Sequence, residues 1–456
     1  EDASGVDLKQ FRNWYSQAGT PRLRVRDNYD AATQQYTLEM TQSCPPTPGQ
    51  TDKAPFVIPV AMGLLGEAGN LPLRVAGQEP DTETADNTQV VLTLHEPLQT
   101  FVFEQVSERP VPSLLRGFSA PVRLDYNYSK QDLYALMIAD ADGFVRWDSA
   151  QALATQVITE VERQIASGQP GTVDPLLFEA VSALLQDSSL DAAMVADMLT
   201  LPTENYLAEL ASQAGGANVD TIHAARETVR VALGQACRDL WLGTYERLAS
   251  SEEYAPSAGQ IAARSLRNTC LDFLAGAEPE LLTLAQQQFS AAQNMTDRLA
   301  ALRVLAFYAD DSIRGPALEQ FYQDWRHEAL VVNQWFQVQA AIPDKQGLER
   351  VQGLLAHADF DLHTPNQVRA LVGVFAGQNP VNFHRREGEG YRFLADMVAQ
   401  LNSLNPQLAS RLLAPLSKWR NYQERGDLMR AELERLAAMP SLSADVFEVV
   451  TKSLQQ

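Results

Sequence analysis

The stretch "PVRLDYNYSKQDLYALMIAD" (residues 121–140) contains the change of hydrophobic period that decides the fold. Before about Ser129, short segments alternate apolar and polar residues, as expected for β-strands with one buried face. After it, apolar residues recur every three or four positions to the end of the chain, as on one face of an α-helix. The sequence therefore predicts a multidomain β + α protein that divides near residue 129.

Seven alternating segments precede this division, and turn residues separate them. They are "RLRVRD" (22–27), "QYTLEMTQ" (35–42), "PFVIPVAM" (55–62), "LPLRVAG" (71–77), "TQVVLTLH" (88–95), "QTFVFEQ" (99–105) and "PVRLDYNY" (121–128). Short strands at this spacing are typical of an antiparallel sandwich. We predict an immunoglobulin- or fibronectin-like β-sandwich over residues 19–129.

The rest of the chain, residues 130–456, predicts a large all-α domain. Thr364-Pro365, Asn379-Pro380 and Asn405-Pro406 combine an N-cap residue with proline at the first helical position. Thr364 and Gln367 also fit a capping box. The first and last of these starts lie 41 residues apart, a period typical of HEAT and armadillo helix pairs. We therefore expect a HEAT/armadillo-like superhelical array, whose kind commonly offers a concave surface.

Composition narrows the classes of function. The 456 residues carry a formal net charge of −21, which argues against a nucleic-acid partner because such proteins need clustered Lys and Arg. No apolar run is long enough to span a membrane, so we expect no membrane partner. Cys44, Cys237 and Cys270 form no C-x-x-C pair. Three free thiols indicate a reducing, cytoplasmic location.

Motifs that would carry catalysis are missing from the sequence. The His-Glu pairs "HEPLQ" (95–99) and "HEALV" (327–331) lack the second His of a zinc-binding H-E-x-x-H. "GFSAP" (117–121) lacks the last Gly of a nucleophile elbow. "HADFDLH" (357–363) could place His357, Asp359, Asp361 and His363 on one face for a divalent metal, or could be a solvated loop before a helix cap; we favour the loop. "HRREGEGYRF" (384–393) predicts a flexible surface loop or the mobile rim of a cavity.

Several separate stretches carry a resemblance to a known family. They include "DLKQFRNWYSQAGTPRLRV" (7–25), "RPVPSLLRGFSAPVRLDYNYS" (109–129), "SLRNTCLDFLA" (265–275), "GVFAGQNPVNFH" (373–384) and "LNSLNPQLASRLLAPL" (401–416). Together they resemble the C-terminal half of bacterial aminopeptidase N, the gluzincin family of zinc aminopeptidases. The resemblance implies that residues 1–18 include the terminal helix of a catalytic domain absent from this chain. It also implies that the zinc and all catalytic residues belong to that absent part.

What the resemblance implies for this chain is a lid with a peptide-contacting face. In the family the helical domain caps the active-site chamber, restricts access and reaches the primed side of the peptide substrate. The matching positions here are Arg369, Gln407 and Arg411. Arg can pair with a peptide carboxylate and Gln with peptide amides, and the i, i+4 spacing places Gln407 and Arg411 on one helix face.

Two functions of different class therefore stand as expectations. The first is the C-terminal portion of a zinc metallo-aminopeptidase, inactive alone, whose partners are the N-terminal and catalytic domains of the same protein and peptide substrates. The second is a stand-alone α-solenoid scaffold that binds peptides or proteins. "DLKQFRNWYSQAG" (7–19) favours the enzyme, because it looks like a helix severed from a neighbour, with Phe11, Trp14 and Tyr15 uncovered.

Overall fold

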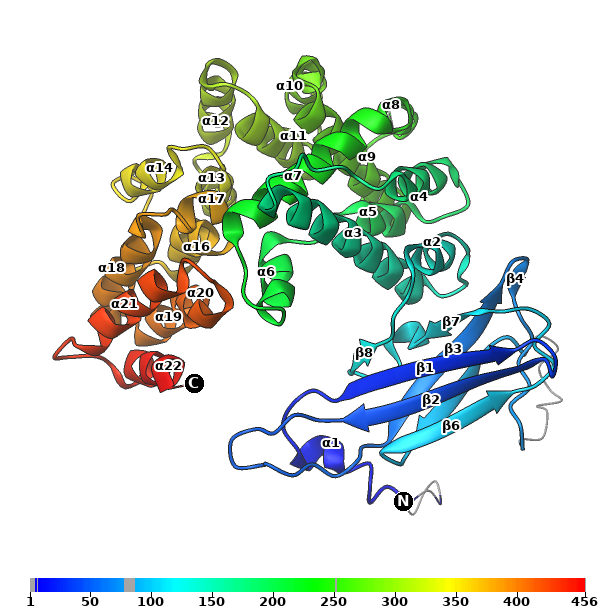
Figure 1. Ribbon diagram of the computed structural model, residues 1–456. Coiled ribbons are helices and arrows are strands. Elements are labelled where there is room, and N and C mark those ends of the chain that lie inside the picture. Colours follow the sequence, from blue (N-terminus) through cyan, green and yellow to red (C-terminus); the bar gives the residue numbers. More distant parts are fainter. Residues whose placement is uncertain (1–4, 6, 78–86, 251, 456) are drawn as a thin grey trace. The chain divides into compact units, whose positions relative to one another are not determined.

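The computed structural model describes residues 5, 7–77, 87–250 and 252–455. Strands occupy the first part of the chain and helices the rest, and the chain divides into two compact units, Glu1–Leu153 and Ala154–Gln456 (Figure 1). We call these the sandwich unit and the helical unit. The predicted fold class, a β-sandwich followed by a large helical array, is confirmed.

Two sheets build the sandwich unit. One has the strand order β6-β2-β1-β8, and in the other β3 pairs with β4, β5 and β7. The strands are β1 (Arg22–Asp30), β2 (Gln35–Ser43), β3 (Ile58–Gly66), β4 (Gly69–Asn70), β5 (Val90–Leu94), β6 (Leu98–Phe103), β7 (Val111–Leu114) and β8 (Arg123–Asp125). All described pairings are antiparallel except that of β1 with β8.

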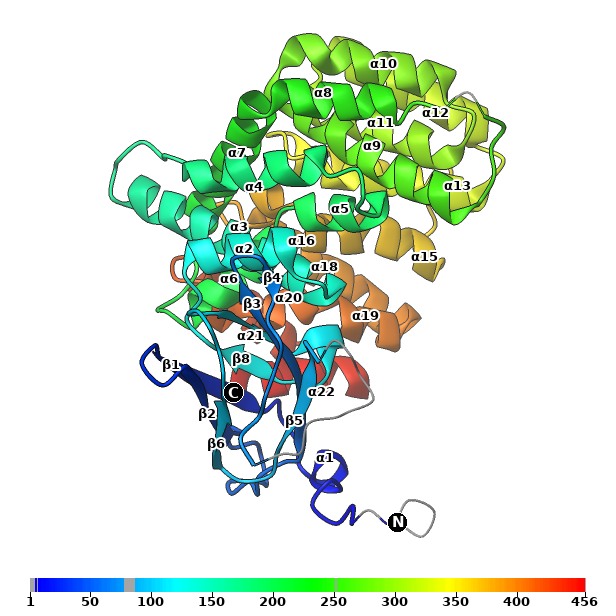
Figure 2. The same cartoon turned by 90° about the vertical axis from the view of Figure 1, so that its right-hand side faces the viewer.

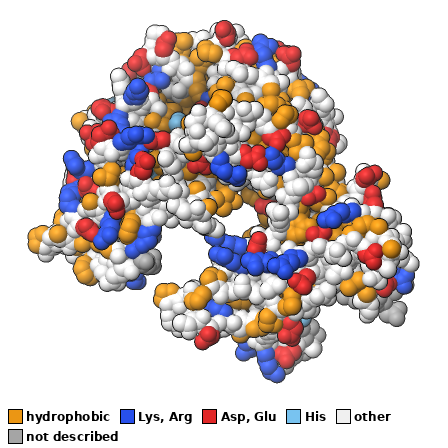
Figure 3. Space-filling view, in the orientation of Figure 1, with side chains coloured by type: hydrophobic (Ala, Val, Ile, Leu, Met, Phe, Trp, Pro, Cys, Tyr) orange, Lys and Arg blue, Asp and Glu red, His pale blue; other side chains and the backbone are white. Residues whose placement is uncertain are grey.

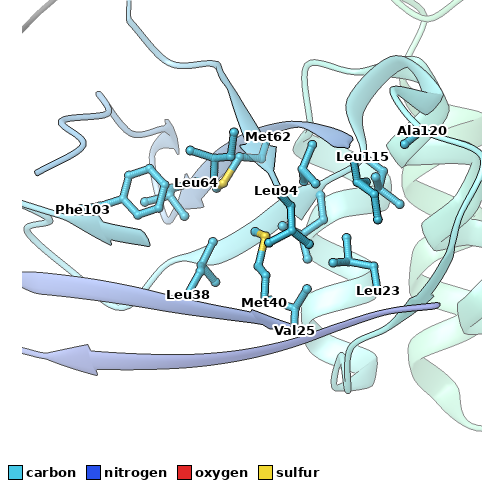
Figure 4. Packing of buried hydrophobic residues seen from close by; sticks show 14 of the residues in the cluster. Leu23, Val25, Leu38, Met40, Met62, Leu64, Leu94, Phe103, Leu115 and Ala120 are labelled. Atoms are coloured by element: carbon cyan, nitrogen blue, oxygen red, sulfur yellow. The ribbon is translucent and has the colours of Figure 1, made fainter. Parts of the chain in front are cut away.

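The core of the sandwich lies between these two sheets. Leu23 and Val25 of β1 and Leu38 of β2 point inward from one sheet toward the side chains of β3 and β5 (Figure 4). On the opposite face of β1, the alternate residues Arg22, Arg24 and Arg26 are exposed. They contribute to a band of basic side chains over β1 and β8 (Figure 3).

Two strand predictions fail at prolines. Residues 71–77 form no regular strand, only an isolated bridge from Val75 to Phe103, because Pro72 has no N–H to give to a ladder. The strand β7 was not predicted, since Pro110 and Pro112 argue against one. It is tolerated because β7 pairs with β3 alone, which leaves one side of the strand without a ladder.

The compact sandwich unit extends to Leu153, so it holds residues on both sides of the change from strands to helices near residue 129. Helix α2 (Lys130–Ala139) and the first half of α3 (Gly143–Ala166) belong to it. The cause is a buried cation: Arg116 donates to Ser113 Oγ at 2.7 Å and to Asn70 Oδ1 at 2.7 Å, and lies 3.3 Å from the carboxylate of Asp140, just after α2. Gly63 makes room for it, since a Cβ there would lie 2.4 Å from Arg116 Cζ.

The N-terminal segment is less helical than predicted. Only α1 (Asn13–Ser16) is helical within residues 7–19. Trp14 packs on Phe56, with ring centroids 4.7 Å apart, and donates to Val57 O at 2.8 Å. Phe11 and Tyr15 remain exposed, Tyr15 to 85%. The segment is therefore attached to the sandwich through one face while its other aromatic face is uncovered.

Helices in the helical unit stack in two layers. In Figures 1 and 2, α8, α10 and α12 form one layer. They lie on one side of the helices α7, α9, α11 and α13, and we call this second group the second layer. The helices are α4 (Pro175–Gln186), α5 (Ala192–Leu199), α6 (Glu204–Ser212), α7 (Val219–Ala236), α8 (Arg238–Arg247), α9 (Ala258–Ala277), α10 (Leu282–Ala291), α11 (Met295–Tyr308), α12 (Asp311–Trp325), α13 (Ala329–Ala341), α14 (Gly347–Leu354), α15 (Pro365–Val368), α16 (Val374–Gln378), α17 (Pro380–Phe383), α18 (Glu389–Leu404), α19 (Pro406–Leu412), α20 (Ala414–Ser417), α21 (Gly426–Ala437) and α22 (Ala444–Gln455). Short 3₁₀ turns η2 (Pro279–Leu281) and η4 (Trp419–Asn421) and a π-helical turn, η3 (Arg369–Gly373), complete this unit, and a further 3₁₀ turn, η1 (Arg116–Phe118), lies in the sandwich unit. In the described part of the chain, no helix is long and apolar enough to cross a membrane.

The sandwich core gives the first testable prediction. Leu38 is fully buried between the sheets, so Leu38→Ala should lower the free energy of unfolding of the sandwich unit by about 2–5 kcal/mol. The matched control is Val91→Ala on β5, whose side chain is exposed and whose loss should cost under about 1 kcal/mol. Native-state hydrogen exchange of the β1 and β2 amides measures both. Equal effects of the two substitutions would contradict this account of the core.

Candidate functional site

Arg369 opens a π-helical turn. The segment α15–η3–α16 runs as one continuous helix, and the π geometry covers Arg369–Gly373. Val368, Ala370, Leu371 and Val372 are buried, whereas Arg369 is exposed and donates to Asn366 Oδ1 at 3.0 Å. Single π-helical turns inside α-helices occur frequently at functional sites, so the local backbone favours the choice of Arg369.

The start of this helix differs from its predicted capping box. Thr364 is the N-cap but makes no side-chain cap bond. Gln367 instead accepts from the backbone N–H of Asp361 at 2.6 Å and donates to the carbonyl of Asp359 at 2.7 Å. The capping-box prediction is wrong because the preceding loop offers Gln367 nearer partners than the N-cap does. The result fastens the loop at 359–361 to the base of the helix.

Gln407 and Arg411 lie on α19, which begins as predicted. Asn405 Oδ1 accepts from Leu408 N at 3.0 Å, and Pro406 is the first helical residue. Leu408, Ala409 and Leu412 are buried, while Gln407 and Arg411 are exposed one turn apart. The Arg411 guanidinium has no hydrogen bond or ion pair to any residue that the structure describes.

The two helices are neighbours at Gly373. A Cβ at Gly373 would lie 3.8 Å from Leu412 Cδ2 and 3.9 Å from Arg369 Cβ. Gly373, which lies one turn after Arg369, is thus the residue that faces α19, the helix that carries Arg411. The two segments approach each other at Gly373 and Leu412.

A seam fixes these C-terminal helices to the start of α7. We use "seam" for the contacts between residues 215–220 and residues 384–386 and 421–425. Ala217 N donates to Asn421 O at 2.7 Å, and Gln423 N donates to Ala217 O at 3.1 Å. The Asp220 carboxylate lies 2.6 Å from Arg386 Nη2 and 3.0 Å from Arg425 Nη2. These two guanidinium groups lower the pKa of Asp220 against the opposing effect of its partial burial.

The stretch 384–393 forms a loop that leads into α18 at Glu389, as one interpretation predicted, but its first residue is buried in the seam and not on the surface. His384 is 5% exposed, and its Nδ1 shares a hydrogen bond of 2.7 Å with the hydroxyl of Tyr391. Arg425 Nε donates to the His384 carbonyl at 3.0 Å. Burial, helped by the Arg425 charge, lowers the pKa of His384 to about 3. Gly388, with φ +73°, turns the chain into α18.

The proposed metal face does not form. His357 Nδ1 accepts from the backbone N–H of Asp359 at 3.1 Å, Asp359 accepts from Tyr322 Oη at 2.6 Å, and His363 pairs with Asp361 at 2.9 Å. The segment turns instead of extending, so its four side chains find separate partners. Among the described residues no group of three or more His, Cys, Asp or Glu side chains could hold a metal ion.

Sequence reasoning missed a cluster of cations on the second layer. Arg226 and Arg230 stand one turn apart on α7 and face Arg303 of α11 across a cavity. The signal was present, since two arginines at i, i+4 interrupt the helix pattern of "HAARETVRVAL" (223–233).

Comparisons with known proteins agree with this architecture. Residues 130–455 match the family model DUF3458_C, a domain of unknown function described as ARM repeats, and residues 19–127 match DUF3458, a domain of unknown function with an Ig-like fold. The chain is 42% identical over 460 residues to aminopeptidase N of Escherichia coli (strain K12) and 38% identical over 456 residues to aminopeptidase N of Haemophilus influenzae. Each match covers 100% of this chain and 51% of the relative.

A solved structure is similar over the same extent. It is Legionella pneumophila aminopeptidase A in complex with aspartic acid, with a TM-score of 0.85 and 30% sequence identity. The match covers 100% of this chain and 51% of that one. The resemblance to aminopeptidase N is thereby confirmed, and the chain spans about half the length of the relatives it matches.

The buried His384 predicts a pH dependence of stability. Its pKa is about 3 when folded against 6.5 when unfolded, so below pH 6.5 the unfolded chain binds a proton that the folded chain rejects. Stability is thus full above about pH 6.5 and falls as pH drops toward 3. Between about pH 6.5 and 4.5, the wild type should lose about 2 kcal/mol more than His384→Gln.

The matched control for this measurement is His223→Gln. Its hydrogen bond to Glu204 raises the pKa of His223, so the contribution of His223 is present at low pH and is lost as pH rises. His223→Gln should therefore lose as much stability as the wild type between about pH 6.5 and 4.5. Urea unfolding across the pH range measures all three proteins, and equal slopes for the wild type and His384→Gln would refute the assignment.

Proposed function

The chain belongs to the DUF3458_C family of ARM-repeat domains, and we propose that it is the C-terminal portion of a zinc metallo-aminopeptidase that removes N-terminal residues from peptides. The observation that carries the proposal is the match of the whole chain to half of several aminopeptidases N. The zinc and the catalytic groups belong to the other half. This portion caps the chamber, restricts access and contacts the peptide.

Arg369, Gln407 and Arg411 contact the primed side of the substrate in this proposal. Support comes from the exposure of all three side chains on the adjacent segments η3 and α19. A guanidinium donates two parallel hydrogen bonds to a carboxylate, which suits the C-terminus of a short peptide. Gln407 supplies both a donor and an acceptor for peptide amides.

Residues 1–18 attach to the missing half in the same proposal. Trp14 anchors the segment to the sandwich, while Phe11 and Tyr15 are left uncovered. Exposed aromatic side chains at adjacent turns are typical of a surface that a neighbour covers. The domains proposed are thus residues 1–18, 19–129 and 130–456. Cys44, Cys237 and Cys270 are unpaired, which supports a cytoplasmic location.

The chain alone should not hydrolyse peptides. Purified residues 1–456 with added zinc should release no chromophore above background from alanyl or arginyl substrates, because the described residues offer no set of metal ligands. Adding the missing half, expressed separately, should restore turnover. Zinc-dependent activity of the chain alone, lost on chelation and retained on repurification, would overturn the proposal.

Substitutions in the full-length parent test the peptide contacts. Arg369→Ala and Arg411→Ala should each raise KM for tri- and tetrapeptides about tenfold, with kcat little changed, because each removes a charge-assisted hydrogen bond that substrate and transition state share. A single-residue chromogenic substrate, which does not extend to these positions, should be unaffected. Arg326→Ala is the control, an exposed arginine after α12. Unchanged KM values for the peptides would remove both arginines from the site.

A further inference from the structure

A polar cavity opens among the second-layer helices. Its volume is about 420 Å³, and its lining residues come from α7, α9 and α11 and from Thr200 and Leu201 after α5. Sites that bind small molecules commonly enclose about 300–1,000 Å³. The cavity lies away from Arg369, Gln407 and Arg411, none of which lines it.

Cations outnumber carboxylates around this cavity. Arg226, Arg230 and Arg303 line it, against the single carboxyl of Asp272. That carboxyl already accepts from Tyr308 Oη at 3.1 Å. Glu227, which pairs with Arg230 at 2.7 Å, adds a second carboxylate beside the cavity. In a chain of net charge −21, three guanidinium groups against two carboxylates still leave a local excess of positive charge.

Two of the three arginines keep hydrogen-bonding capacity. Arg226 donates Nε to Pro202 O at 2.8 Å, but its Nη1 is 3.7 Å from Glu227, beyond hydrogen-bond distance. Arg303 has no hydrogen bond or ion pair among the described residues and lies over the Phe307 ring, 5.5 Å from its centroid. Both guanidinium groups therefore have N–H groups that can donate to a ligand.

The third arginine is held rigidly behind them. Arg230 is 6% exposed, and its Nε and Nη2 bind Glu227 at 3.0 and 2.7 Å. Its guanidinium packs against Tyr308, 4.7 Å from the ring centroid. Its Nη1 is buried without a hydrogen-bond acceptor in the part of the chain that the structure describes. Arg230 is thus held in a fixed position by Glu227, which balances its charge, and its Nη1 keeps an unused N–H donor.

We propose that this cavity binds a small anion bearing a carboxylate or phosphate group, held by the guanidinium groups of Arg226 and Arg303. Arg is suited to both groups because its planar fork donates two parallel hydrogen bonds. Ser265, Asn268 and Thr269 of α9 also line the cavity. The hydroxyls of Ser265 and Thr269 donate to backbone carbonyls of their own helix, so the arginines supply the donors for the anion. The site is independent of the proposed peptidase function.

Calorimetric titration of the 456-residue chain at low ionic strength tests the site. The probes are inorganic phosphate, N-acetylalanine as a carboxylate, and N-acetylalaninamide as its uncharged match. Phosphate or N-acetylalanine should bind saturably with a dissociation constant on the order of 1 mM, and the amide should not bind. Whichever anion binds more tightly identifies the preferred group. No saturable binding of either anion, or equal binding of the amide, would overturn the proposal.

Variants locate the binding in the cavity. Arg303→Gln and Arg226→Gln should each weaken binding about tenfold or more, while the control Arg326→Gln should leave it unchanged. Glutamine keeps helix propensity close to that of arginine, and Arg303 is exposed, so Arg303→Gln should fold even if Arg226→Gln does not. Wild-type affinity in a folded Arg303→Gln variant would overturn the assignment.

Discussion

The ion pair between Arg425 and Asp220 constrains the rest of the helical unit. Arg425 is 5% exposed and cannot lose its proton, so it needs acceptors wherever it is buried. It finds them in the Asp220 carboxylate and the His384 carbonyl. Removing one partner of a buried pair commonly costs about 3–5 kcal/mol; partial exposure of Asp220 places this pair toward the lower end. The pair joins residues 205 positions apart in the chain.

Such a long-range contact changes the mechanics of the array. In helical repeat proteins each unit usually contacts only its neighbours, so curvature adds up freely along the chain. Here the seam ties the start of α7 to the turns before α18 and α21. The segments η3 and α19 lie within the tied part of the chain. Their exposed arginines therefore stand on backbone that the seam restrains, and the proposed binding of a peptide there would cost little in ordering.

Particular residues show how far the sequence could predict this structure. The change of period near Ser129 and the caps at Asn379 and Asn405 depend on local hydrogen bonds and burial, and each is present as expected. The wrong predictions share a different cause. The Gln367 side chain bonds to the preceding loop and not to its N-cap, and His384 is buried by residues that lie far away in the sequence. A sequence pattern reports only on residues that are close along the chain. It therefore does not predict hydrogen-bonding partners that the tertiary fold brings close. For the same reason the π turn at Arg369 had no sequence signal.

Net charge was a poor guide to where anions can bind. The charge of −21 is a sum over 456 residues, whereas a ligand responds to charges within about one Debye length, roughly 8–10 Å in ordinary buffers. Arg226 and Arg230 are one helical turn apart, and Arg303 lies across the same cavity. The acidic groups that dominate the sum are spread over the solvated surface, where water and salt screen them. A local group of arginines can therefore attract an anion in a strongly acidic protein, and the acidic exterior keeps nonspecific polyanions away from it.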